Sequence, residues 1–404
     1  MANDLNILLV EDSSSEQKYV KQVINSLGHT VTSCASGEEA WELFSRNNFQ
    51  LLLLDWVLPG MDGLELCRRL RTTPAGEKVS IVVITARSEP EDLEKVLEAG
   101  ADDYISKMTG PHLFRVRLRI ALQQAYMRKE KVKADEALAA LNNRLIRDQH
   151  AAAQIQQSML PKSLPVYRDL SFDYLFMPCE EMGGDVLNIF RLDENTIGFY
   201  LVDIAGHGIE AALFAAMINS ILQPSMYHSS LSRWFLEESR TYRIVPPVMV
   251  AEKLNKEFPF GVSDQLIFTL IYGIFDCKSF TLKYAAAGQQ GIIFQPVAQG
   301  ARVIKVPSFP IGAYPEPGYE EQIIQFQPGD RFFVFSDGVS ETKNPKNEQF
   351  GDNRIKEVLD RTCGLNIKDS VKEIITDVFT FRGNVDQGDD VTILSIEVLP
   401  QSQR

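Results

Sequence analysis

Five residues in the first third of the chain are of the types needed to accept a phosphoryl group. They are Glu11, Asp12, Asp55, Thr85 and Lys107, and each lies at or just after the end of a short apolar run. A carboxylate that attacks phosphorus must overcome like-charge repulsion, which a hard divalent cation held by oxygen ligands relieves. Asp55 would be the nucleophile, and Asp12, helped by Glu11, would hold Mg²⁺. Lys107 would pair with one phosphoryl oxygen, and Thr85 would donate a hydrogen bond to another.

A second set of acids is found in the last 240 or so residues, in four clusters that adjoin apolar runs. Oxygen ligands with no cysteine and hardly any histidine suit Mg²⁺ or Mn²⁺ and not Zn²⁺. Two such ions about 4 Å apart can share a water, lower its pKa and direct it at phosphorus. A single Asp-Gly pair is more simply a turn, but four clusters in one region favour a metal site. The clusters are Met182–Asp185, Val202–Gly208, Ser336–Glu341 and Gly388–Thr392.

Composition excludes several classes of protein. At 404 residues the chain is too long for one typical core, so we expect two domains or more. The formal net charge of −13 argues against a nucleic-acid partner. The five cysteines are scattered without a CxxC pair, which fits a reducing compartment. The N-terminus has no basic segment typical of a signal peptide, and no run reaches the roughly 18 apolar residues of a membrane span. We therefore expect a cytoplasmic protein with no membrane partner.

The elements that must position the first set of residues are short strands alternating with amphipathic helices over residues 5–110. Such alternation, with nearly continuous apolar strands, is typical of an α/β fold with a parallel sheet covered on both faces. Ligands of such sheets bind at the carboxyl ends of the strands. The five polar residues are expected at that edge.

Residues 112–160 contain neither proline nor glycine and are rich in good helix formers. Two apolar seams with 3-4 spacing, out of phase near residues 129–134, predict a coiled coil with a stutter and hence a homodimer. A single helix that packs on its own domains is the alternative. The first seam is Leu118, Leu122, Ala125, Lys129 and Val132. The second is Ala134, Leu138, Leu141, Leu145, Asp148, Ala152, Ile155 and Met159.

After Pro161, several predicted strands follow one another directly, which indicates an α+β domain. We place the boundaries at 1–122 for the first domain, 112–162 for the helical linker continuous with its last helix, and 163–404 for the last domain. Residues 224–247 are expected to form a surface excursion next to the second site.

The order and spacing of the first set resemble the receiver domain of two-component response regulators over about 120 residues. The resemblance implies a five-stranded doubly wound parallel sheet, a histidine kinase or phosphotransfer protein as phosphodonor, and Asp55 as phosphoacceptor. The carbonyl of Val57 would complete the Mg²⁺ ligands, and Tyr104 would be the switch aromatic. Lys107 is followed by Met108 where receivers usually have proline, which puts the geometry of the switch surface in doubt.

The four acidic clusters together resemble the metal-dependent PPM serine/threonine phosphatases, in particular the bacterial branch that controls partner switching of sigma factors. The resemblance implies a β-sandwich flanked by helices and two Mn²⁺ or Mg²⁺ ions. Asp203 would bridge both ions, and the carbonyl of Ile204 would bind one. Asp337 and Asp389 would bind the other, and Asp185 would act directly or through water. Residues 154–161 also resemble that branch's linker.

Three positions near this site have more open roles. Asp390 is a neighbour of the ligands. Asn188 stands where the family often has a second aspartate, so we expect one charge to be missing near the metal site. His207 could pass a proton, but in its Gly-rich turn a role in capping the next helix is the interpretation we favour.

The resemblances imply that phosphorylation of Asp55 controls a phosphatase through the linker. The substrate would be a phosphorylated anti-sigma-factor antagonist. One alternative is a pseudophosphatase adaptor that binds a regulatory protein without turnover, which Asn188 supports in part. Another is a broad phosphatase acting on kinases or small phosphoesters.

Overall fold

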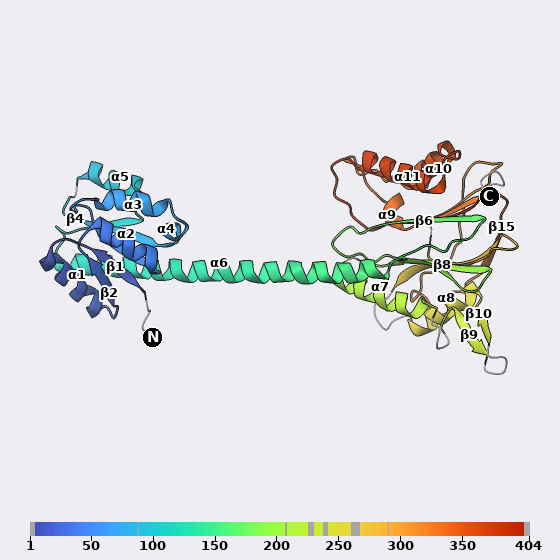
Figure 1. Ribbon diagram of the computed structural model, residues 1–404, viewed down its shortest axis with the longest axis horizontal. Helices are drawn as coiled ribbons and strands as arrows, with labels where there is room; N and C mark the ends of the chain where they lie inside the picture. Colours follow the sequence, from blue (N-terminus) through green and yellow to red (C-terminus); the bar gives the residue numbers. More distant parts are fainter. Residues whose placement is uncertain are drawn as a thin grey trace. The chain divides into compact units, whose positions relative to one another are not determined.

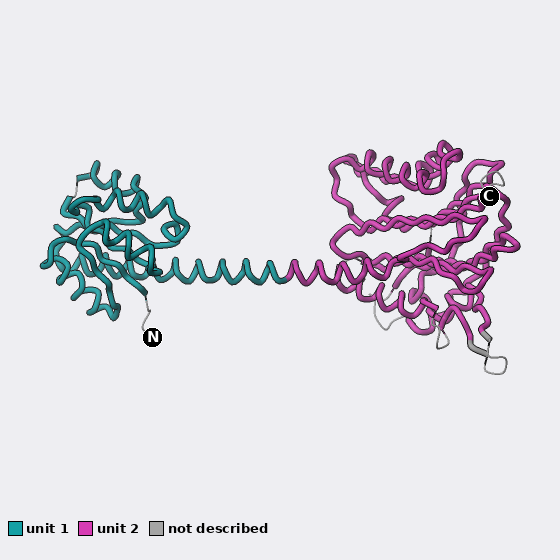
Figure 2. The backbone as a smooth tube through the Cα atoms, in the orientation of Figure 1, with its two compact units in different colours: residues 1–144 teal, residues 145–404 magenta. Residues whose placement is uncertain are grey.

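A computed structural model describes residues 5–87, 89–206, 208–224, 230–236, 241–259, 267–289 and 291–399. The chain forms two compact units, residues 1–144 and 145–404 (Figure 2). His207 and parts of the predicted excursion at 224–247 lie outside the described residues. Among the described residues, no helix combines the length and apolar character needed to cross a membrane.

The first unit contains a five-stranded parallel sheet of order β2-β1-β3-β4-β5. Alternate residues of the strands face opposite sides, so Leu8 and Leu52 pack with α2, α3 and α5, and Leu9 and Leu53 pack with α1 and α6 (Pro111–Met159). The predicted doubly wound sheet is therefore confirmed. Its elements are β1 (Ile7–Val10), α1 (Ser14–Ser26), β2 (Val31–Cys34), α2 (Gly37–Arg46), β3 (Leu51–Asp55), α3 (Gly63–Arg71), α4 (Pro74–Lys78), β4 (Ser80–Thr85), α5 (Pro90–Glu98) and β5 (Asp103–Ser106).

Local sequence signals set where these helices begin. Ser13, Ser36 and Asp62 precede α1, α2 and α3, and each side-chain oxygen accepts the N–H three residues later. The glycine at the start of α3 has a packing reason as well. A Cβ on Gly63 would lie 2.1 Å from the carbonyl oxygen of Asp55. Glycine thus lets α3 begin directly against the end of β3, where Asp55 is held.

Helix α6 (Pro111–Met159) starts in the first unit and ends in the second. Leu118, Leu122 and Ala125 are buried against the sheet of the first unit, whereas Leu138 and Leu141 are about two-thirds exposed. The first seam therefore packs on its own domain, as the single-helix alternative proposed, and its interpretation as coiled coil is wrong. The change of phase coincides with the end of this packing. The second seam stays a prediction.

The second unit is a sandwich of two antiparallel sheets, of order β15-β12-β11-β8-β7 and β14-β13-β16-β17-β6, with a separate β9–β10 hairpin. Its strands are β6 (Leu170–Met177), β7 (Val186–Arg191), β8 (Thr196–Ile204), β9 (Arg233–Leu236), β10 (Thr241–Ile244), β11 (Phe268–Asp276), β12 (Thr281–Ala287), β13 (Gly291–Gln295), β14 (Arg302–Val303), β15 (Glu321–Gln325), β16 (Arg331–Phe335) and β17 (Val391–Val398).

Helices cover both outer faces of the sandwich (Figure 1). One apolar cluster lies between the sheets, a second lies under α7 and α8, and a third lies under α10 and α11. The predicted sandwich flanked by helices is thus confirmed. The helices are α7 (Ile209–Leu222), α8 (Pro247–Glu257), α9 (Asp337–Ser340), α10 (Gly351–Arg361) and α11 (Ile367–Arg382).

Candidate functional sites

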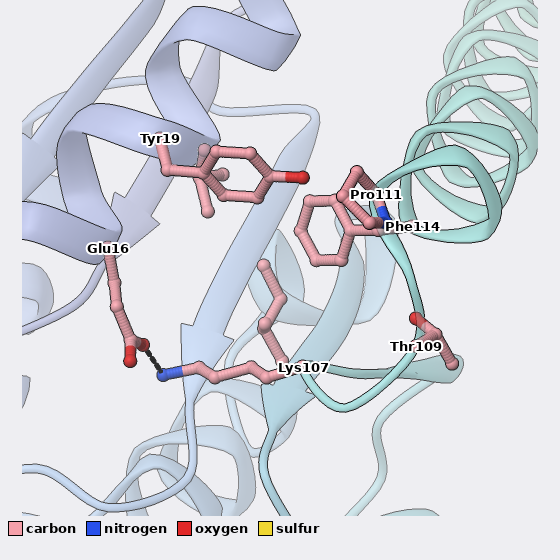
Figure 3. A pocket seen from close by; sticks show the side chains of 8 residues that line it. Glu16, Tyr19, Lys107, Thr109, Pro111 and Phe114 are labelled. Carbon is pink, nitrogen blue, oxygen red and sulfur yellow. Dashed lines mark hydrogen bonds and ion pairs between the residues drawn. The ribbon is translucent and has the colours of Figure 1, made fainter.

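The carboxyl edge of the parallel sheet brings three strand ends together around Lys107. Its Nζ donates to Asp55 Oδ2 and Glu11 Oε2, both at 2.8 Å. It also forms an ion pair with Glu16, on the first turn of α1 (Figure 3). Sequence reasoning missed Glu16, because nothing in the sequence separates it from other acids on the first turn of a helix.

Burial raises the pKa of Glu11 to about 7; the hydrogen bond from Lys107 opposes this shift and the charge of Asp55 adds to it. Burial alone would lower the pKa of Lys107, but its hydrogen bonds to Asp55, Glu11 and Glu16 raise it above the ordinary value. Lys107 therefore stays charged, and it only partly neutralises the acids around it.

The donor set at this edge fits Mg²⁺. Carboxylate oxygens of Glu11, Asp12 and Asp55 lie within 4.8 Å of one another, and Asp12 is exposed. Val57 is also exposed, with its N–H 3.4 Å from Asp55 Oδ1. An all-oxygen set with one open side is what a small hard cation that keeps several waters requires.

Thr85 and Tyr104 lie on the neighbouring strands. Thr85 ends β4, is buried, and its hydroxyl accepts the N–H of Arg87 at 3.1 Å. Tyr104 is half-buried against the cluster that packs with α2, α3 and α5. Met108 is exposed, and its N–H donates to Ser106 Oγ at 3.2 Å, a bond that proline could not form. This hydrogen bond thus closes the turn after Lys107.

A pocket of about 270 Å³ opens beside this site (Figure 3). The Glu16–Lys107 ion pair lies on its rim, and the rings of Tyr19 and Phe114, 5.6 Å apart, form part of its wall. Phe114 belongs to the first turn of α6. Lys107 and the first turn of α6 therefore line the same pocket.

In the second unit, acids from four separate segments converge. Asp203 lies near the end of β8, Asp337 begins α9 after β16, and Asp185 and Asp389 lie just before β7 and β17. The charge of Asp203 raises the pKa of Asp185, and the charges of Asp337 and Asp389 raise the pKa of Asp203. The structure thus brings the predicted side chains to one place.

Strand alternation explains why Asp203 reaches this place and Asn188 does not. Phe199 and Leu201 face the space between the sheets, and Asp203, two residues on, points to the same side. Asn188 pairs in register with Tyr200, hydrogen-bonds its hydroxyl, and faces α7. The expectation that Asn188 leaves a charge missing beside the metal site is therefore wrong.

The converging acids are held in an unfavourable state. Burial raises the pKa of Asp203 to about 8, and the charges of Asp337 and Asp389 add to the shift. Partial burial and then the charge of Asp389 raise the pKa of Asp337 to about 6. Burial and the charge of Asp203 raise the pKa of Asp185 well above its usual range. A nearby cation would reverse each of these shifts.

Asp390 fixes the backbone beside the converging acids. It is buried, its Oδ1 accepts the N–H of Cys179 at 2.8 Å, and its Oδ2 accepts the N–H of Asp185 at 3.1 Å. Ligand atoms of Cys179, Asp389 and Asp390 also lie within 4.8 Å of one another. Burial and then the charge of Asp390 raise the pKa of Cys179 to about 12, so this thiol is protonated near neutral pH.

Two of these acids, Asp203 and Asp337, line a groove of about 400 Å³. Sequence reasoning missed Gln289, a buried residue on the groove wall whose side-chain oxygen accepts the hydroxyl of Thr269 at 3.1 Å. Its amide also donates to the carbonyl of Phe335, two residues before Asp337. Gln289 therefore joins β11 to the end of β16. A glutamine after a run of alanines gave no signal of this role.

The groove's donor set fits two hard divalent cations. Asp203 and Asp337 line the groove, the charge of Asp389 acts on both of them, and the carbonyl of Ile204 lies so close to Gly184 that a Cβ there would be 2.9 Å from it. The ligand atoms are all oxygens, which suits Mg²⁺ or Mn²⁺. Deprotonated carboxylates at this density are stable only with cations among them.

Comparisons with known proteins divide the chain in the same way. Residues 7–119 match the family described as "Response regulator receiver domain", and residues 193–399 match "Stage II sporulation protein E (SpoIIE)". "Regulator of RpoS" of Escherichia coli (strain K12) is 29% identical over 229 residues, which cover 55% of this chain and 67% of the relative. "Response regulator RppA" of Synechocystis sp. is 39% identical over 105 residues, 26% of this chain and 44% of the relative.

Among solved structures, the "SiaA-PP2C domain of Pseudomonas aeruginosa" is similar with a TM-score of 0.53 and 19% identity, covering 64% of this chain and 99% of that one. This likeness shows the fold. The match to SpoIIE spans just over half of the chain. The chain therefore belongs to the SpoIIE family, and it joins an N-terminal response regulator receiver domain to a C-terminal PPM phosphatase domain.

Proposed function

We propose that the second unit removes phosphate from serine or threonine of a partner protein in a metal-dependent reaction. The observation that carries this proposal is the convergence of Asp185, Asp203, Asp337 and Asp389, of which Asp203 and Asp337 line an open groove. Bound Mn²⁺ or Mg²⁺ would supply a water of lowered pKa and neutralise charge on the phosphoryl oxygens. A groove open to solvent admits a side chain presented by a folded protein.

The chain's own residues would have distinct tasks in this reaction. Asp203 would bridge two ions, with Asp337 and Asp389 on one of them and the carbonyl of Ile204 on the other. Asp185, fixed by the hydroxyl of Thr392 at 2.5 Å, would bind through water or directly. Asp390 would hold the two segments together through the N–H groups it accepts.

The partner that we propose as substrate is a phosphorylated anti-sigma-factor antagonist. Membership of the SpoIIE family supports a regulatory phosphoprotein over a small metabolite. Removing its phosphate would free it to bind an anti-sigma factor. A broad phosphatase acting on kinases or small phosphoesters is the competing proposal, and comparing kcat/KM for the two substrate classes would decide between them.

The receiver would control this activity. A histidine kinase or phosphotransfer protein would pass its phosphoryl group to Asp55, with Mg²⁺ bound by Glu11, Asp12, Asp55 and the carbonyl of Val57. Lys107 already donates to Asp55, so it is placed to pair with the transferred group. Thr85 would turn toward that group and Tyr104 inward, and the first turns of α6 pack on the same sheet.

We further propose that the chain forms a homodimer through the exposed part of α6. Leu138, Leu141, Leu145 and Ile155 are all at least half exposed there. Coiled-coil pairing would bury them. Sedimentation of wild type and of Leu141→Glu would test this, since the dimer requires the charged variant to be monomeric.

The test of the catalytic proposal is hydrolysis of para-nitrophenyl phosphate with Mn²⁺, with Mg²⁺ and with EDTA, for wild type and Asp203→Ala. We expect metal-dependent turnover that falls at least 100-fold in the variant, because the bridging carboxylate is lost. Folded wild-type protein without turnover would favour the pseudophosphatase adaptor. Asn188 no longer supports that alternative, because it lies away from the acids.

A further inference from the structure

The end of helix α6 contacts the loop that carries Asp185. Gln156 is 8% exposed, its Nε2 donates to the carbonyl of Gly183 at 2.6 Å, and its Oε1 accepts the N–H of Gly183 at 3.1 Å. The side-chain amide thus satisfies both backbone groups of one residue, as a neighbouring strand would. Buried backbone groups require such partners, so Gln156 fixes the position of this peptide.

Two more contacts from the same helix reach the same loop. Ala153 is buried with Met182 and with Ala212 of α7. His150 Nδ1 lies 3.0 Å from Glu181 Oε2. Three successive residues of the loop are therefore contacted by helix positions three residues apart. Among these contacts, only that of Gln156 is buried and hydrogen-bonded to the backbone.

Gly183 leads directly to the candidate metal ligands. A Cβ on Gly183 would lie 2.1 Å from Asp390 Oδ2, the same oxygen that accepts the N–H of Asp185. Asp185 in turn lies close enough to Asp203 for the charge of Asp203 to raise its pKa. The path from Gln156 to the proposed bridging carboxylate therefore runs through the backbone of residues 183–185 and two carboxylates, with no flexible side chain exposed to solvent.

We infer that Gln156 is a positioning residue for the phosphatase metal site. It holds Gly183, and through it Asp185 and Asp390, in the arrangement that lets the acids share divalent cations. The inference rests on the proposed function only in taking these acids as metal ligands. It also gives a role to the part of α6 that lies next to the second unit's site.

The shape and the hydrogen bonds of Gln156 can be separated by two substitutions. Gln156→Leu removes both bonds. Gln156→Glu keeps the size of the side chain but replaces the donor with a carboxylate oxygen that faces the carbonyl of Gly183. The exposed neighbour offers a matched control, Gln157→Leu. Loss of a residue that orients metal ligands typically weakens metal affinity by about 10- to 100-fold.

The experiment measures Mn²⁺ binding to the full chain by calorimetry and hydrogen exchange of the backbone at residues 182–185. We expect both Gln156 variants to bind Mn²⁺ about tenfold more weakly than wild type and to exchange faster at this loop, with Gln157→Leu unchanged. Wild-type affinity in Gln156→Glu would overturn the inference, because filling space would then be the only role of Gln156.

The two proposals can fail separately. Wild type that binds Mn²⁺ without hydrolysing para-nitrophenyl phosphate would overturn the catalytic proposal, while the binding data would still test Gln156. Turnover in wild type with equal Mn²⁺ affinity in all variants would overturn the role of Gln156 alone. Wild type that binds no Mn²⁺ at this site would overturn both.

Discussion

The two acidic sites of this chain handle like charge in different ways. In the receiver, Lys107 lies among Glu11, Glu16 and Asp55 and donates to all three. In the phosphatase domain, burial and the charges of other acids have the largest effects on the pKa of Asp203 and Asp337. The receiver site therefore carries its own cation, whereas on our proposal the phosphatase site takes its cations from solution.

This difference suits the receiver site to act as a switch and the phosphatase site to act as a catalyst. A lysine that already holds Asp55 keeps the unphosphorylated receiver folded and can exchange a carboxylate for a phosphoryl oxygen. In the phosphatase site, bound metal and not an internal lysine would relieve the repulsion between the acids. Their carboxylate oxygens therefore stay available as ligands. The receiver should thus tolerate metal removal better than the phosphatase domain.

The largest expected effect separates the two sites completely. Asp55→Asn should abolish phosphorylation by acetyl phosphate, because the amide is not a nucleophile for phosphorus. Mn²⁺-dependent turnover of the unphosphorylated chain should stay within about twofold of wild type, since Asp55 belongs to the first unit. Phosphate-affinity gels and para-nitrophenyl phosphate assays measure the two properties. A phosphorylated band in the variant would show that another residue is the acceptor.

The next effect tests the internal cation of the receiver. Lys107→Met should destabilise the first unit by about 3 kcal/mol, because removing one partner leaves buried Glu11 beside Asp55 without a counter-charge. Urea unfolding followed by the fluorescence of Trp41 and Trp56, both in the receiver, measures this. Millimolar Mg²⁺ should restore part of the loss. Unchanged stability in the variant would mean that the lysine does not hold the cluster together.

Much of the receiver could be predicted from its sequence, because the carboxyl ends of parallel strands share one edge. Glu11, Asp55 and Lys107 each follow a recognisable apolar run, so the local sequence is enough to predict that their side chains lie close together. Glu16 could not be predicted as a partner of Lys107, since its position depends on how α1 lies against that edge. The first seam of α6 failed for a related reason. A 3-4 pattern does not tell whether a helix packs on a sheet or on a second helix.

The phosphatase site shows where sequence proximity misleads. Asn188 lies within β7, on the same side as Val186 under α7 and α8, whereas Asp185 lies just before the strand among the other acids. Gln156 and Gln289 contribute through single side-chain amides that contact backbone far away in sequence. Residue type and spacing carry no information about such pairs, whereas motifs rich in aspartate and glycine are recognisable because each supplies a ligand and a turn together.

A third prediction concerns metal and pH. Mn²⁺ at 100 times its Kd should stabilise the phosphatase domain by about 2.7 kcal/mol. The folded-state pKa of Asp203 and Asp337, about 8 and about 6, lies above the unfolded value of about 3.9. Without metal, the folded domain thus binds more protons between pH 4 and 8, and its stability falls as pH rises through this range.

Calorimetric scans at pH 6 and pH 8, with EDTA or Mn²⁺, would measure this linkage. The melting temperature in EDTA should be lower at pH 8, and the increase caused by Mn²⁺ should be larger at pH 8, because protons no longer compete for the carboxylates. Mg²⁺ should change the receiver's transition less than Mn²⁺ changes that of the phosphatase domain. Equal shifts for the two transitions would remove the contrast between the two sites.

The smallest effect on metal binding is expected from Asn188→Asp. The new carboxyl would lie beneath α7 with Tyr200 and Asn219, where Tyr200 donates to Asn219 and Asn188 to Tyr200. Aspartate cannot donate when ionised, so the domain should lose about 1–3 kcal/mol of stability. Mn²⁺ affinity should change less than about twofold, since the charge faces away from Asp203. If the substitution instead strengthened Mn²⁺ binding severalfold, Asn188 would belong to the metal site, and the assignment of opposite faces in β7 would be wrong.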